Sequence, residues 1–132
     1  MDLHDLERET LELFRPPKRQ TVSEWADENR VLVSESSSEP GPWRTDRAPY
    51  QREIMDAVTQ RGVPEIVVMS SSQVGKSEIE LNMMGQAIDN DPGPMLYVQP
   101  TDSVAEDYSK RRIAPMISAC PTLRQKIYRA KG

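Results

Sequence analysis

The stretch IVVMSSSQVGKSEIELNMMG, residues 66–85, decides the fold that this sequence predicts. It begins with a short run of apolar and β-branched residues, which is typical of a buried strand. Small and polar residues follow and end in Gly-Lys-Ser at 75–77. The next residues place apolar side chains on one broad helical face. A strand, a polar loop and a helix in this order indicate a loop that holds nucleotide phosphates.

The loop matches three of the four fixed positions of the Walker A pattern G-x-x-x-x-G-K-[ST]. Gly75 allows the backbone turn that points N–H groups at phosphates, Lys76 reaches the β and γ phosphates, and the Ser77 hydroxyl is a ligand for Mg²⁺. Ser70 replaces the first glycine of the pattern with another small residue. An incidental strand-to-helix turn is the alternative. The predicted nucleotide-binding residues are Ser70, Ser71, Ser72, Gln73, Val74, Gly75, Lys76 and Ser77, with Lys76 and Ser77 also catalytic and with ATP and Mg²⁺ as cofactors.

Hydrophobic spacing and turn residues predict helices and strands on both sides of this loop. Helices are expected over 2–14, from Thr21 with its Thr-x-x-Glu capping box, over 50–60, and from 102 or 103 with a second capping box at Ser103. Strands are expected at 65–69 and 95–99, and the polar run 34–42 reads as a loop or linker. A strand, helix, strand unit predicts an α/β fold with a parallel sheet and a right-handed crossover.

Composition and charge narrow the class of protein further. The chain has 132 residues and one cysteine, Cys120, which excludes an internal disulfide and a zinc site built from several cysteines. Residues 110–132 contain seven lysines and arginines and no acid, within a chain of net charge −4. This distribution favours contact with phosphates. The alternative is that compensating acids lie in sequence beyond residue 132.

Four stretches resemble, in the same order, the large terminase subunits of lambda-like tailed phages and prophages. They are TVSEWADENRVL (21–32), WRTDRAPYQREIMDAV (43–58), SSSQVGKSE (70–78) and LYVQPTDSVAEDYSKRRIAPMI (96–117). In that family the large subunit is an ATP-driven motor that threads double-stranded DNA into an empty capsid, and an endonuclease that cuts concatemers into unit genomes. The resemblance implies a helicase-like P-loop NTPase sheet preceded by a helical segment, and the host bacterial cytoplasm as location.

The resemblance also implies roles for individual residues. Tyr50 and Gln51 occupy the place of the adenine-recognising segment, and an aromatic ring and an amide suit that task; an ordinary aromatic residue at a helix start is the alternative. Gln73 is placed to sense the γ phosphate. Pro100-Thr101 resembles the DNA-contacting segment of helicase-type motors. The implied DNA contacts are Thr101, Lys110, Arg111 and Arg112, although basic residues also suit a solvated helix end.

The resemblance divides the chain into residues 1–42, a helical segment and linker, and residues 43–132, the N-terminal part of the ATPase domain. The implied partners are DNA, the small terminase subunit, the capsid portal and further copies in the assembled motor, with no membrane. The acidic helix 2–14 is expected to dock on the small subunit, or else to pack on this domain. The paired acids that complete such a magnesium site are missing after 95–99, and so are the nuclease carboxylates. We therefore expect an incomplete ATPase segment that is inactive alone.

Other functions remain open at this stage. A helicase-like DNA translocase outside packaging would share the phosphate loop and the Pro-Thr segment. A catalytically inert prophage remnant would act only as a binding module through helix 2–14. A small-molecule P-loop kinase fits less well, because the sequence lacks a lid or an acceptor motif.

Overall fold

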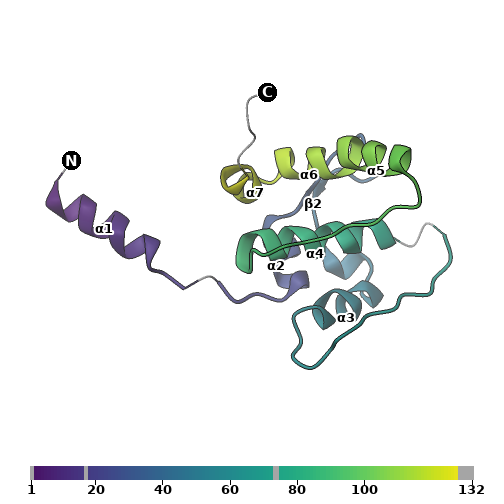
Figure 1. Ribbon diagram of the computed structural model, residues 1–132, viewed down its shortest axis with the longest axis horizontal. Coiled ribbons are helices and arrows are strands. Elements are labelled where there is room, and N and C mark those ends of the chain that lie inside the picture. The colour runs from purple at the N-terminus through teal and green to yellow at the C-terminus, as the bar shows by residue number, and fades with distance from the viewer. Residues whose placement is uncertain (1, 17, 73–74, 128–132) are drawn as a thin grey trace.

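The computed structural model describes residues 2–16, 18–72 and 75–127 (Figure 1). Helix α4 lies at the centre, where it contacts α2, α3 and α7, and α1 lies apart from the other helices. The elements in chain order are α1 (Leu3–Leu13), α2 (Val22–Asn29), β1 (Val31–Leu32), β2 (Gly41–Pro42), the 3-10 helix η1 (Thr45–Arg47), α3 (Tyr50–Ala57), α4 (Lys76–Asn90), α5 (Asp102–Tyr108), the π-helix η2 (Ser109–Ile113), α6 (Ala114–Ala119) and α7 (Pro121–Lys126).

The packing of α2 on α4 depends on one tryptophan and one glycine. The indole of Trp25 is fully buried and lies directly on Gly85, where any Cβ would collide with the ring. The indole nitrogen donates a hydrogen bond to Asp89, at 2.9 Å from Oδ2. Because glycine has no side chain, the ring fills the space between the two helices and sets their separation.

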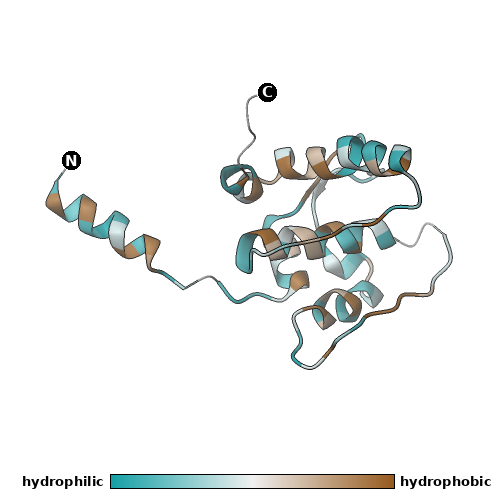
Figure 2. Cartoon of the chain, in the orientation of Figure 1, coloured by the Kyte–Doolittle hydropathy of each residue, from teal (hydrophilic) through white to brown (hydrophobic). Residues whose placement is uncertain are grey.

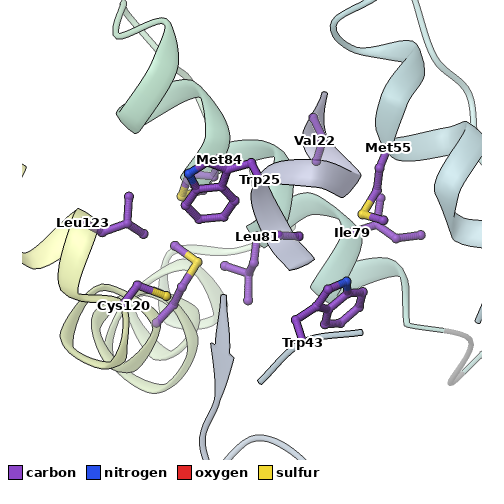
Figure 3. Packing of buried hydrophobic residues seen from close by; sticks show 11 residues of the cluster. Val22, Trp25, Trp43, Met55, Ile79, Leu81, Met84, Cys120 and Leu123 are labelled. Carbon is purple, nitrogen blue, oxygen red and sulfur yellow. The ribbon is translucent and has the colours of Figure 1, made fainter. Parts of the chain in front are cut away.

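The hydrophobic core gathers around this contact (Figure 3). Leu81 of α4 lies in the middle of the view, between Trp25 and Trp43. Burial raises the pKa of the Cys120 thiol, which lies fully buried beside Leu123. The buried hydrophobic residues are Val22, Trp25, Ala26, Trp43, Met55, Ile79, Leu81, Met84, Met116, Cys120 and Leu123.

The predicted capping box of α2 is confirmed. The Thr21 hydroxyl accepts from the Glu24 amide, and the Glu24 carboxylate accepts from the Thr21 amide. The Asp56 carboxylate of α3 adds a second acceptor at this end, because it takes the backbone N–H and the hydroxyl of Ser23 at 2.9 and 2.8 Å. The start of α2 is thereby tied to α3, and α3 packs on α4.

The predicted parallel sheet is not confirmed. The sheet of the described residues is a two-stranded antiparallel pair, in which Val31 faces Pro42 and Leu32 faces Gly41. Gly41–Pro42, at the end of the expected linker 34–42, is therefore a strand, and it pairs with Val31–Leu32 just before that linker. The expected strands 65–69 and 95–99 lie instead as unpaired connecting chain. A pair of short parallel strands is marginal by itself, since parallel strands are normally buried on both faces.

These two connecting segments carry apolar side chains on the surface. Met69 is 96% exposed and Leu96 is 88% exposed, and Figure 2 shows both segments partly coloured as hydrophobic. Tyr97 and Ile66 are less exposed. The Tyr97 ring packs on the core and its hydroxyl bonds to Glu80 of α4, while Ile66 is half-buried. The segment 95–99 therefore runs along α4 without forming a ladder with 65–69.

The helical predictions are confirmed with small shifts at their ends. The helix expected at 2–14 is α1, whose apolar side chains are all exposed. The helix expected from 102 or 103 begins at Asp102, but the predicted capping box at Ser103 is wrong: the N-cap is Thr101, whose hydroxyl accepts from the Val104 amide at 3.2 Å. In the described part of the chain, none of the helices has the length and apolarity needed to cross a membrane.

We expect Gly85→Ala to destabilise the fold. Alanine improves helix propensity by up to about 1 kcal/mol, but its methyl group would overlap the buried Trp25 ring, and such overpacking typically costs about 1–3 kcal/mol. The net effect is a loss in the free energy of unfolding, measured by urea denaturation.

Gly93→Ala is the matched control. A Cβ at this position meets nothing within 4 Å, so the free energy of unfolding should stay within about 0.5 kcal/mol of the original. Equal stabilities for the Gly85 and Gly93 variants would contradict the proposed Trp25 contact.

Candidate functional site

The phosphate loop turns sharply at Gly75, which is the N-cap of α4. Its φ is 85° and its ψ is 21°, in the left-handed region that favours glycine. Ser70, Ser71 and Ser72 lead into this turn and are exposed, while the predicted site residues Gln73 and Val74 lie outside the described residues. The chain then enters α4 at Lys76. The arrangement presents the first N–H groups of a 15-residue helix toward the loop, as an anion seat requires.

The structure places the two candidate catalytic residues in the first turn of α4. The ammonium of Lys76 folds back over the loop and donates to the backbone oxygen of Ser70 at 3.4 Å. Ser77 is the next residue and is half-buried. Lys76 thus lies over the loop rather than extended into solvent, with its charge at the helix end where anions are favoured.

The two residues expected at the adenine lie in different surroundings. Tyr50 is exposed at the first position of α3. Gln51 is 4% exposed, and its side-chain amide lies so close to Gly75 that a Cβ there would collide with it. The structure therefore places Gln51 against the phosphate loop itself, and the assignment of both residues to adenine stays a prediction.

A cavity of about 210 Å³ borders the turn at Gly75. One of its walls is formed by residues 36–39, which belong to the segment expected to be a loop or linker. A larger cavity, about 650 Å³, lies elsewhere, between residues 18–24 and the C-terminal half of α4. Lys76 lines a third cavity, of about 230 Å³, together with Ile66 and Val68, whereas Gly75 lines the cavity of about 210 Å³. Its lining residues are Leu32, Ser36, Ser37, Ser38, Glu39, Trp43, Arg44, Arg47, Ala48, Gln51, Gly75 and Glu78.

The candidate DNA contacts fall into two groups. Lys110 and Arg111 are exposed and form ion pairs one helical turn back, with Glu106 and Asp107. Arg112 turns inward, where its Nη1 lies 3.1 Å from the Ser36 oxygen and 3.5 Å from Oε1 of Glu78. Thr101 is exposed, and its hydroxyl serves as the N-cap of α5.

Two stacked tyrosines connect the segment after α4 with α5. The rings of Tyr97 and Tyr108 are 5.0 Å apart at an interplanar angle of 22°. Burial raises the pKa of the Tyr97 hydroxyl, and its hydrogen bond to Glu80 adds to this shift. Burial also raises the pKa of Tyr108, whose hydroxyl lies 3.5 Å from the Ser77 oxygen. Both phenols therefore stay neutral and act as hydrogen-bond donors toward α4.

Comparison with known families identifies the family of this chain. The sequence model described as "Phage terminase large subunit gpA, ATPase domain" matches residues 37–132. This chain belongs to that family. The large terminase subunit of Escherichia phage lambda is 38% identical over 111 residues, which cover 84% of the chain and 17% of that protein. The large terminase subunit of Enterobacteria phage P21 is 32% identical over 103 residues, covering 78% of the chain and 16% of that protein. No solved structure matches the chain.

The chain therefore spans about a sixth of the length of these terminase relatives. The predicted resemblance to large terminase subunits is confirmed, and the matched region contains the turn at Gly75 and most of the residues that line the cavity beside it, although Leu32 and Ser36 precede that region. Within the described residues, no group of three or more histidine, cysteine, aspartate and glutamate side chains gathers as a metal site.

Sequence analysis missed two residues of the candidate site. Arg30, at the end of α2, is 3% exposed, and its Nη2 lies 2.6 Å from Oε2 of Glu78. Its Nη1 donates to Oδ1 of Asn82 at 2.9 Å. Glu78 directly follows Ser77, but an acid in the first turn of a helix is ordinary. The local sequence thus held no signal for the buried ion pair.

We expect Gly75→Ala to destabilise the terminase segment for two separable reasons. The left-handed backbone costs about 1–2 kcal/mol for a residue with a side chain, and the added methyl group collides with the Gln51 amide. The substitution Gln51→Ala removes only the collision, so Gly75→Ala should cost less in that background. Urea unfolding of the four proteins measures the difference, with an expected interaction energy of about 0.5–3 kcal/mol. If Gly75→Ala lowers the free energy of unfolding equally in both backgrounds, the Gln51 side chain does not restrict the side chain at position 75.

Proposed function

We propose that this chain forms the nucleotide-binding part of an ATP-driven motor that packages phage DNA. The observation that carries the proposal is the left-handed turn at Gly75, which begins α4 so that Lys76 and Ser77 occupy its first turn. The match to the terminase ATPase domain supports ATP as the nucleotide. Ser70–Ser77 is the proposed phosphate seat, including Gln73 and Val74.

The residues present fit ATP and Mg²⁺ by their chemistry. Gly75 supplies the left-handed backbone that begins α4, and the N-terminal N–H groups of α4 favour an anion. We assign Lys76 to the β and γ phosphates, since its ammonium already lies over the loop. The Ser77 hydroxyl would hold Mg²⁺, which neutralises charge on the transferred phosphoryl group when bound. Gln51 would support the loop while Tyr50 offers an aromatic face to the base.

We propose that segments 65–69 and 95–99 are strands of a parallel P-loop sheet in the whole ATPase domain. Their exposed apolar side chains support this proposal, because a central parallel strand hides both faces under helices. The division into a helical segment, 1–42, and an ATPase part, 43–132, belongs to the same proposal.

The remaining terminase functions are proposed from the family. Thr101, Lys110 and Arg111 are the proposed contacts to double-stranded DNA, since the two basic side chains are exposed. Helix α1 presents an exposed apolar face with acids beside it, which supports docking on the small subunit. The capsid portal, an oligomeric motor, DNA cutting by an endonuclease and the host cytoplasm complete the proposal.

The nucleotide site is tested by binding of an ATP analogue that carries a fluorescent methylanthraniloyl group. Trp43 lines the cavity beside Gly75 and serves as the energy donor. Lys76→Ala should weaken binding at least about tenfold, because loss of a charged hydrogen bond is worth about 1.5–3 kcal/mol. Ser77→Ala should weaken binding in Mg²⁺ but not in EDTA.

Lys18→Ala provides the control for lost charge. Lys18 is exposed and pairs with Glu28, away from the loop, so its removal should leave nucleotide affinity unchanged. Equal binding by the original chain and the Lys76 variant would overturn the assignment of the phosphate seat.

We expect the 132-residue chain to bind nucleotide weakly and to hydrolyse none. Hydrolysis requires further carboxylates for the magnesium site, and the sequence after residue 99 contains no apolar run that ends in paired acids. The measurement is phosphate release from ATP, with and without DNA. Turnover that disappears in Lys76→Ala would refute this expectation.

A further inference from the structure

Two side chains from the end of α5 and from η2 contact two consecutive residues in the first turn of α4. Tyr108 and Arg112 are four residues apart and therefore share a helical face. The Tyr108 hydroxyl lies 3.5 Å from the backbone oxygen of Ser77, and Nη1 of Arg112 lies 3.5 Å from Oε1 of Glu78. The first turn of α4 thus contacts the segment 108–113 through these two side chains.

Arg112 also holds the opposite wall of the cavity beside Gly75. The same Nη1 donates to the backbone oxygen of Ser36 at 3.1 Å. Ser36 and Glu78 both line this cavity together with Gly75. The Arg112 guanidinium therefore connects the loop that contains Ser36 to the first turn of α4, and these two elements form opposite walls of the cavity beside Gly75.

The two ion pairs of Glu78 differ in burial. Arg30 is 3% exposed and binds one carboxylate oxygen at 2.6 Å, with Asn82 as its second acceptor. Arg112 is 39% exposed and lies 3.5 Å from the other oxygen. Breaking the buried pair would leave a charge unpaired in the core, which is costly. The longer, more exposed pair is weak, so it is the contact that can change.

The neighbours of Arg112 face away from this junction. Lys110 and Arg111 are exposed and pair with acids of their own helix. The segment Ser109–Ile113 is a π-helix, a local widening that often occurs at functional sites. The π-helix η2 therefore carries both kinds of basic side chain: Arg112 points toward α4, whereas Lys110 and Arg111 point into solvent.

We propose that Arg112 is a positioning residue that links nucleotide occupancy beside Gly75 to the conformation of the basic segment 109–113. The inference rests on the proposed nucleotide site. Phosphates bound at the first turn of α4 would bring negative charge to the same turn as Glu78. That charge repels the Glu78 carboxylate and attracts the Arg112 guanidinium, so the bound and free states differ in how strongly they hold Arg112. Such a difference in interaction is what coupling between two sites requires.

The test is hydrogen exchange of the backbone amides of 109–113 in the 132-residue chain, with and without the ATP analogue AMP-PNP and Mg²⁺. In the original chain we expect saturating nucleotide to change exchange of this segment about fivefold or more. Arg112→Ala should abolish the change. Arg112→Lys should reduce it, because one ammonium cannot reproduce the planar fork of a guanidinium. Arg124→Ala is the control, since Arg124 likewise donates to a backbone oxygen, that of Ser118, yet lies on α7.

Binding of the methylanthraniloyl nucleotide is measured in parallel, so that the possible results are distinguishable. A nucleotide-dependent change that persists in Arg112→Ala overturns the inference, and so does nucleotide binding without any change in the original chain, although the proposed function then stands. Failure of the original chain to bind nucleotide overturns both. If Arg112→Ala melts before the experiment, Arg112→Lys decides, and a full change in that variant overturns the inference.

Discussion

The contact between Trp25 and Gly85 fixes the position of α4, and every part of the candidate site depends on that helix. Because the ring lies directly on the glycine backbone, α2 and α4 have one separation at which both the indole and its hydrogen bond to Asp89 fit. This contact lies near the C-terminal half of α4, whereas the phosphate loop enters at its N-terminus. The helix therefore acts as a rigid rod, held at one end by packing and offering its other end to a ligand. The buried pair of Arg30 and Glu78 adds a second attachment close to the loop, which limits rotation of α4 about its own axis.

The electrostatics of the α4 N-terminus combine opposing charges. The helix dipole and Lys76 make this end positive, and Glu78 in the same turn places a carboxylate there. Two arginines from different segments occupy the two oxygens of that carboxylate. The acid is thereby compensated by protein groups and does not cancel the anion-binding character of the turn. The same pairing explains why an acid is compatible with the position directly after Ser77.

Local sequence signals predicted local structure well. The capping box at Thr21, the helix after Gly75 and the turn at Gly75 all depend on neighbouring residues, so they could be read from the pattern. The sheet could not be read in this way, because a strand forms only when a partner lies beside it, and segments 65–69 and 95–99 have none among the described residues. The ion pair of Arg30 and Glu78 joins residues 48 positions apart, and neither residue type signals its partner. Likewise, the polar segment 34–42 gave no indication that its serines would line the cavity next to Gly75. The segment 110–112 looked uniformly basic, yet only the three-dimensional arrangement separates Arg112 from its two neighbours.

The reactivity of the buried Cys120 thiol reports how often α6 and α7 open to solvent. It is the single thiol of the chain, it has no accessible surface, and its raised pKa keeps it protonated at neutral pH. Alkylating reagents attack the thiolate, so reaction must wait for a fluctuation that exposes α6 and α7 to solvent. The labelling rate of this one atom therefore counts how often the C-terminal helices separate from α4, without any introduced dye or substitution.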